Sequence, residues 1–289
     1  MNKKFDRRRK YYMILDCETA TLPIASTYGE VAKKSIAIAK PLIYDLGWTI
    51  TDRQGNIYEK KNFLISEIFS VPSIFNTAYY AFKRPIYLEK LRKGEIILTD
   101  WKTATNELIE SLKYCEAVGA YNSMFDFKKA IPFTELYINK LYSEDFFKWE
   151  KFQNEICDDI ANGRKKSAKK EFEPSYFLFR GEKYNLFDLW GLSCKYILNC
   201  DEYKQMCLDC DWRSSSEKYF KTSAETTYRF LKKDLDFDEQ HTALNDAEIE
   251  TEIFAYIVKK TIKNLEMGIE FFPFKILGTT VEFESRIFP

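Results

Sequence analysis

Apolar residues form short runs near the start of the chain. Residues 11–15 are continuously apolar, which is typical of a strand buried on both faces. Two longer apolar stretches, 42–50 and 57–65, flank the polar segment 51–56. This pattern predicts two antiparallel strands joined by a turn. The first 65 residues therefore predict the beginning of a β-sheet.

The middle of the chain changes to helical spacing. Residues 74–91, which are rich in aromatics, and residues 125–141 are expected to be helical, although each segment contains a proline. A clearer helix begins after Asp100, whose side chain can cap it. A short strand is expected at 117–121. Strands and helices thus alternate in this region.

The second half predicts a hairpin at 177–189 that turns at Gly181. Further helices are expected at 189–199, 201–209, 223–234 and 242–264, followed by a strand-rich tail at 267–289. Ile249, Ile253 and Ile257 fall on one face of the last helix. Strands first and interleaved helices afterwards predict a three-layer α/β domain, a mixed central sheet with helices on both faces.

Composition narrows the class of protein. The 289 residues are 45% apolar and 17% aromatic, which excludes disorder as the main state. No apolar run reaches 18 residues, so we expect no contact with a membrane. The basic start, 1–10, precedes an apolar stretch too short for a signal peptide. Seven cysteines do not resemble a disulfide framework, and we expect a cytoplasmic protein.

Charge alone leaves the ligand open. Forty-four basic and 44 acidic residues cancel, yet a basic cluster and an acidic metal site can offset each other. Asp16 and Glu18 follow the first apolar run. Side chains of a strand alternate, so both acids should point to one side and Cys17 to the other. Taken alone, the pair is better explained as a solvated strand end.

Two more positions carry candidate chemistry. Asp126 begins a helix after the strand at 117–121, where an ordinary helix cap is the alternative explanation. Asp246 is in register with the buried face of the last helix, so its carboxylate needs a partner, for which a metal is one candidate. His241 is the only histidine and falls on the loop before that helix, where it is otherwise a surface residue.

The three motifs together carry a resemblance. They are Ile14-Leu-Asp-Cys-Glu-Thr-Ala20, Ala120-Tyr-Asn-Ser-Met-Phe-Asp126 and His241-Thr-Ala-Leu-Asn-Asp-Ala247. In this order the chain resembles the DEDDh 3′–5′ exonuclease family, which includes the epsilon proofreading subunit of DNA polymerase III, ribonuclease T and oligoribonuclease. The resemblance implies a ribonuclease-H-like fold over residues 11–265. The basic arm 1–10, insertions at about 67–99 and 142–186, and a C-terminal extension 266–289 would be additions to it.

The resemblance also implies a set of roles. Two Mg²⁺ or Mn²⁺ ions, about 4 Å apart, would be bound by four carboxylates, since hard cations prefer oxygen ligands. These carboxylates are Asp16, Glu18, Asp126 and Asp246. His241 would be the general base, because a neutral imidazole can take a proton from water near pH 7. The residues implied to contact substrate are Thr19, Ala20, Asn122 and Phe125.

The expected activity is hydrolysis from the 3′ end of single-stranded nucleic acid, with release of nucleoside 5′-monophosphates. DNA is the favoured substrate, and an exoribonuclease that trims RNA is the alternative. A nucleic-acid-binding module that has lost catalysis is the rival from another class. A further hypothesis is a subunit that proofreads only when it is docked to a polymerase or to another replication or repair partner.

Other features have competing interpretations. Cys194, Cys200, Cys207 and Cys210 suggest zinc, but their spacing is unusual and burial in helices explains them too. The basic arm, Lys3, Lys4, Arg7, Arg8, Arg9 and Lys10, either contacts phosphates or only adds solubility. The lysine-rich stretch 162–170 is expected to be a solvated loop, and Asp188 is expected to be structural. Four aromatics could stack on bases or belong to the core: Tyr79, Tyr80, Phe82 and Trp101.

Overall fold

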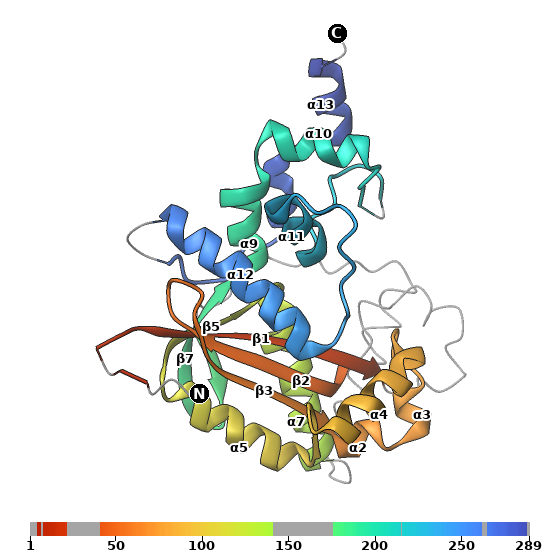
Figure 1. Cartoon of the computed structure of the whole chain (residues 1–289), viewed down its shortest axis with the longest axis vertical. Coiled ribbons are helices and arrows are strands. Elements are labelled where there is room, and N and C mark those ends of the chain that lie inside the picture. Colours follow the sequence, from red (N-terminus) through yellow and green to blue (C-terminus); the bar gives the residue numbers. More distant parts are fainter. Residues whose placement is uncertain are drawn as a thin grey trace, which may run out of the picture.

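A seven-stranded mixed sheet forms the centre of the protein in a computed structural model, which describes residues 5–6, 8–21, 41–140, 176–214, 216–261 and 265–287 (Figure 1). The strands are β1 (Tyr11–Thr21), β2 (Pro41–Thr51), β3 (Ile57–Ile65), β4 (Ile97–Thr99), β5 (Cys115–Ala120), β6 (Tyr176–Phe179) and β7 (Glu182–Asp188). Their spatial order is β4-β3-β2-β1-β5-β7-β6. Among the five central strands, β3-β2-β1-β5-β7, only β2 runs against the others. The fold is therefore α/β.

Helices cover both faces of the sheet, as the sequence predicts (Figure 1). On one face lie α5 (Trp101–Leu112) and α7 (Ile131–Lys140), and on the other lies α12 (Ala243–Thr261). The remaining helices are α2 (Ser66–Phe69), α3 (Pro72–Phe75), η3 (Ala81–Lys83), α4 (Arg84–Lys93), α6 (Ser123–Phe125), η4 (Asp126–Ala130), α9 (Leu189–Ser193), η5 (Cys194–Leu198), α10 (Asp201–Asp209), α11 (Ala224–Lys232), η6 (Pro273–Leu277) and α13 (Thr280–Ile287).

Period-two alternation on β1 divides the core into two clusters. Met13 and Leu15 pack with the α5 and α7 side, whereas Tyr12 and Ile14 pack with α12. All of residues 11–15 are buried, so the predicted burial on both faces is confirmed. The antiparallel pairing of β2 with β3, and the hairpin of β6 with β7, are confirmed as well. Gly181 turns that hairpin with a φ of 87°.

The N-terminus of α12 lies directly on β2. A Cβ atom at Gly47 would come within 2.3 Å of the backbone nitrogen of Leu244, so only glycine permits this approach. The buried carboxylate of Asp45 accepts a hydrogen bond from the backbone N–H of Ala243 at 3.0 Å. Such an acceptor satisfies one of the free amides at a helix start. These two contacts fix the position of the first turn of α12, including Asp246.

Two expectations about element boundaries are wrong. β1 continues to Thr21, so Asp16 and Glu18 lie inside the strand and not after its end. The tail is not strand-rich: it contains η6 and α13, and its strand contacts are isolated bridges at Gly268 and Thr279. Short apolar runs do not distinguish a strand from a buried helix, and here packing against other helices decides. Both Leu277 and Phe283 join the helical cluster around α12.

Prolines also behave differently from expectation. Residues 74–91 do not form one helix but α3, η3 and α4. Pro85 lies in the first turn of α4, where its missing N–H costs no helical hydrogen bond. Pro132 is the second residue of α7, which continues directly from the π-helical turn η4, so the helical run goes on past the proline but its hydrogen-bonding pattern changes there. The helix after Asp100 is confirmed, since the Asp100 side chain accepts from the Thr103 N–H at 2.8 Å.

The added segments are described only in part. The lysine-rich stretch 162–170 and most of the insertion at 142–186 lie outside the described residues, as do Lys3, Lys4 and Arg7. Arg9 donates to the Tyr58 hydroxyl, and Lys10 forms an ion pair with Glu116. These contacts lie where β1 begins, at the end of the strand away from the acids. Within the described ranges, every helix is too short or too polar to cross a membrane.

The Gly47 contact predicts a large effect of one methyl group. Gly47→Ala should lower the free energy of unfolding by about 1–3 kcal/mol, because the first turn of α12 must move away from β2. Urea denaturation measures this loss. Gly94→Ala is the comparison, since its Cβ would meet no atom and only left-handed strain of about 1 kcal/mol is expected. An unchanged stability of Gly47→Ala would contradict the close approach.

Candidate metal and catalytic centre

β1 presents two carboxylates to the helix α12. Asp16 and Glu18 follow Tyr12 and Ile14 on the same side of the strand, whereas Cys17 lies in the cluster on the opposite face. The predicted alternation is therefore confirmed. The pairing of β1 with β2 shifts by one residue directly after Glu18, so the alternation changes there.

Asp246 reaches the same place from the first turn of α12. Its side chain is buried, as the helical register predicts, and its Oδ1 atom has no hydrogen-bond partner within the described part of the chain. A carboxylate near a helix N-terminus is stabilised by the dipole and by the free amides. That stabilisation does not replace a direct partner, and a cation is one partner that would suit this buried oxygen.

His241 lies on the loop just before α12 and has a left-handed backbone, with φ of 50°. Its ring stacks on Tyr80, with ring centres 4.4 Å apart and planes 13° apart. Lys83 donates to the carbonyl of Gln240 at 2.6 Å, and Nδ1 of His241 lies 3.4 Å from Oε2 of Glu239. The 67–99 insertion thus holds the histidine loop, a role that the sequence does not reveal.

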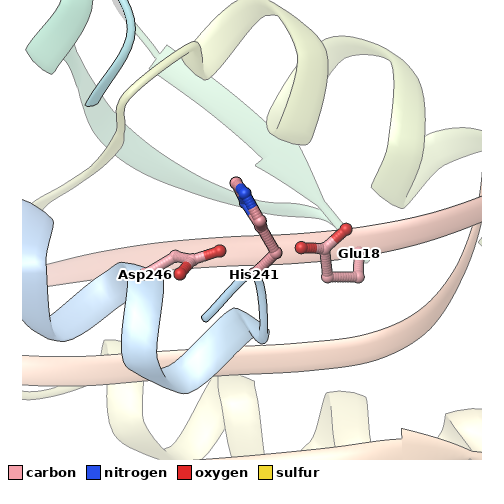
Figure 2. A group of neighbouring side chains, drawn as sticks. All are labelled: Glu18, His241 and Asp246. Carbon is pink, nitrogen blue, oxygen red and sulfur yellow. The ribbon is translucent and has the colours of Figure 1, made fainter. Parts of the chain in front are cut away.

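The three side chains form one group. One ligand atom from each of Glu18, His241 and Asp246 lies within 4.8 Å of the other two. Figure 2 shows the carboxylates of Glu18 and Asp246 on either side of His241. Two carboxylate oxygens and an imidazole nitrogen are a donor set that divalent metals accept. The residues fit a cation, with an imidazole nitrogen of His241 within reach as one of its ligands.

The other two predicted ligands lie nearby but are arranged differently. Burial, and then the charges of Glu250, Asp246 and Asp126, raise the pKa of Asp16 well above its ordinary value. Asp126 is buried at the start of η4, where its Oδ1 accepts a hydrogen bond from the Cys17 thiol at 3.0 Å. Neither residue belongs to the close group formed within the described ranges.

One acid of the centre was missed from the sequence. Glu250 is buried and accepts the backbone N–H of Tyr121 at 3.1 Å, and its charge is second only to burial in raising the pKa of Asp16. It stands four residues after Asp246, so it lies on the same helical face. That spacing was the signal that could have identified it.

The remaining candidate contacts with substrate are exposed to different degrees. Asn122 is exposed at the end of β5, Thr19 and Phe125 are half-buried, and Ala20 is fully buried in the core. Trp101 also belongs to the core, whereas Tyr79 and Phe82 are exposed.

Asp188 and the four cysteines are structural in character. Asp188 accepts the N–H groups of Ser123 and Gly191, which supports the structural role expected for it. The cysteine segment offers no zinc site among the described residues, because no three of its thiols come within ligand distance. Cys194 and Cys207 are simply buried, and burial raises the pKa of the Cys194 thiol.

The carboxylates are strongly desolvated. Burial, followed by the charges of Glu239 and Asp45, raises the pKa of Asp246 to about 8, and burial raises the pKa of Asp126 to about 7. Burial, followed by the charges of Asp246 and Asp45, raises the pKa of Glu18 well above its ordinary value. Burial and Lys83 lower the pKa of His241, which keeps the imidazole neutral near pH 7. A divalent cation would supply the missing positive charge.

Comparisons with known proteins do not add to this picture. A scan against protein-family models finds no match, and a search of curated proteins finds no similar sequence. The interpretation of the centre therefore rests on the three motifs and on the geometry above.

The raised pKa values predict opposite effects of pH on the metal-free and metal-loaded protein. A carboxyl whose folded pKa exceeds its unfolded value stabilises the fold at low pH, and this stabilisation is lost as pH rises to the folded pKa. The melting temperature in EDTA should therefore fall between pH 5 and pH 8, the window set by Asp246. The increase in melting temperature on adding Mn²⁺ should grow over the same window, because metal competes with protons.

Two variants test the source of this effect. Asp246→Asn should weaken both trends, whereas Asp211→Asn, whose side chain is 88% exposed, should leave them unchanged. Equal behaviour of the two variants in the thermal-shift measurement would show that the trends come from other groups.

Proposed function

We propose that the protein is a divalent-metal-dependent 3′–5′ exonuclease that releases nucleoside 5′-monophosphates from the ends of single-stranded nucleic acid. The observation that carries the proposal is the convergence of Glu18 from the first motif with His241 and Asp246 from the third. These residues are far apart in the sequence, and their proximity in the fold supports the roles that the resemblance implies for them.

The architecture supports the same proposal. The sheet is mixed, β2 alone is reversed among its five central strands, and helices cover both faces. This arrangement is consistent with a ribonuclease-H-like domain over residues 11–265 that carries additions. The C-terminal extension packs on this domain through Leu277 and Phe283.

We infer that Asp16, Glu18, Asp126 and Asp246 hold two Mg²⁺ or Mn²⁺ ions. When bound, such ions neutralise the carboxylates, lower the pKa of water and stabilise a leaving oxygen. The Oδ1 atom of Asp246, which has no hydrogen-bond partner among the described residues, is available to bind such an ion. The thiol of Cys17 occupies only one lone-pair site of the Asp126 carboxylate, so Asp126 keeps acceptor capacity.

His241 is proposed as the general base. Its lowered pKa leaves a ring nitrogen free to accept the proton of the attacking water near pH 7. Stacking on Tyr80 and the hydrogen bond from Lys83 to Gln240 restrict the ring, which limits the entropy lost in orienting it.

The alternatives differ in what they need from the centre. A nucleic-acid-binding module without catalysis gains nothing from three acids as close together as Asp16, Asp246 and Glu250, because their repulsion and desolvation destabilise the fold. An exoribonuclease would use the same groups, so we propose DNA first and let the assay decide. A cytoplasmic location and a polymerase or repair partner are parts of the same proposal.

Loss of the Asp16 carboxylate on β1 or of the Asp246 carboxylate on α12 should abolish cleavage. Asp16→Ala and Asp246→Ala remove proposed metal ligands while leaving the fold intact, because they also relieve repulsion among buried acids. The measurement is degradation of matched, 5′-labelled DNA and RNA oligomers with Mg²⁺ or Mn²⁺. Asp211→Asn serves as the control variant. Near-normal turnover by either alanine variant, or no degradation of any strand by the parent protein, would refute the proposal.

The base assignment predicts a separation of binding from chemistry. His241→Ala should slow cleavage by about 10²–10⁴-fold, yet keep the Mn²⁺-dependent rise in melting temperature. The cleavage rate of the parent protein should increase with pH, because only the neutral imidazole of His241 accepts a proton. The midpoint of this increase should lie below the ordinary pKa of histidine, because the pKa of His241 is lowered. If metal affinity falls in step with activity, His241 is a ligand and not the base.

A further inference from the structure

A cavity of about 490 Å³ lies after the end of β5, where Tyr121 and Asn122 line it; of the site residues expected from the sequence, Asn122 alone is among its described lining residues. It is bounded by Trp190 of α9, by Tyr219 and Lys221 from the loop before α11, and by Phe274 of η6. Its volume falls within the range of small-molecule sites, roughly 300–1,000 Å³. One wall comes from the C-terminal extension, so the cavity is not a feature of the core domain alone.

Three aromatic rings form the walls of this cavity. The rings of Trp190 and Phe274 are nearly parallel, 25° apart with centres at 6.0 Å, and Tyr219 meets Phe274 edge-on at 4.9 Å. Nε1 of Trp190 donates to Oγ1 of Thr222 at 2.9 Å, which fixes the indole plane. Flat, fixed rings of this kind favour stacking with a planar ligand.

The polar groups of the cavity favour an anion. Lys221 lines it, and the ammonium of Lys218 lies 5.5 Å from the ring centre of Tyr219. No Asp or Glu appears among its described lining residues, although Glu225 lies 3.8 Å from Lys221. Asn122 and several hydroxyl groups offer hydrogen bonds. A planar aromatic group attached to a phosphate meets all of these features.

Direct contacts connect the cavity to the acidic centre. Tyr121 lines the cavity; its hydroxyl donates to the carbonyl of Thr222 at 3.0 Å, and its N–H donates to Glu250. The charge of Glu250 in turn acts on Asp16. On the other side, Lys221 is close enough to lower the pKa of His241. The cavity and the acidic centre are therefore joined through Tyr121 and Glu250.

We propose that this cavity binds an unpaired base of a nucleic-acid strand, upstream of the 3′ terminal nucleotide held at Glu18, His241 and Asp246. The identity of the ligand rests on the proposed function. The base stacks on a face of these aromatic walls, and Lys221 and Lys218 lie near its phosphates. Base pairing would hide the base from such a cavity, so the subsite makes the enzyme selective for single strands.

The test is a series of fluorescein-labelled oligothymidylates, two to eight nucleotides long, measured by fluorescence anisotropy in EDTA and by hydrolysis with Mn²⁺. As the oligomer is lengthened one nucleotide at a time, the affinity of the parent protein should rise by about 5- to 150-fold in a single step, which is the gain expected from one stacked base. In Tyr219→Ala and Trp190→Ala this step should shrink or disappear, with KM raised for long strands and kcat retained. Tyr114→Ala is the matched control, because this exposed tyrosine stacks on Phe5 near the start of β1.

The outcomes separate this inference from the proposed function. Hydrolysis by the parent with the same length dependence in all variants would overturn the subsite and leave the exonuclease intact. No hydrolysis, but a length step in binding that Tyr219→Ala removes, would support the subsite and overturn the exonuclease. A matched oligouridylate series distinguishes RNA from DNA, and a preference for duplex over single strands would overturn the inference. Circular dichroism of each variant confirms folding, and Lys221→Ala gives an independent variant if Trp190→Ala is unfolded.

Discussion

The close approach of the first turn of α12 to β2 is the contact on which the centre depends. Gly47 leaves no side chain between strand and helix, and Asp45 accepts the first free amide of the helix. Because Gly47 pairs with Asp16 in the sheet, the helix start is set directly over the acidic part of β1. Packing of the helix backbone on β2 therefore brings the third motif next to the first, independently of the side chains of the centre.

Packing a helix over a row of acids carries an electrostatic cost. Asp16, Glu18 and Asp246 lose water and face one another, which raises the pKa of each. Near neutral pH the metal-free centre must either hold protons or tolerate repulsion. Apolar residues at these positions would pack at less cost, so the acids serve a purpose other than stability. The cost is recovered only when positive charge enters, which links the stability of the fold to its proposed cofactor.

Sequence patterns predicted the parts of the centre that depend on local periodicity. Alternation along β1 gave the shared side of Asp16 and Glu18, and helical register gave the burial of Asp246. Contacts between distant segments could not be predicted in this way. The stacking of Tyr80 on His241 and the thiol of Cys17 on Asp126 depend on how separate elements pack. The C-terminal tail was wrongly predicted to form strands, because short apolar runs occur in both strands and buried helices. Its packing against neighbouring helices favours the helical form.

The 67–99 segment and the C-terminal extension offer contacts for substrate recognition that the carboxylates of the proposed centre cannot provide. In the proposed function, bound metal ions would contact a phosphate and its neighbouring oxygens, which DNA and RNA share. Discrimination between the two would then come from groups that contact the base or the sugar. The segment 67–99 reaches the centre through Tyr80 and Lys83, and the C-terminal extension reaches the aromatic cavity through Phe274. The 67–99 segment contacts the loop around His241, and the C-terminal extension contacts the loop before α11 through Phe274 and Tyr219. In the proposed function, changes in either segment would alter substrate choice without touching the proposed metal ligands.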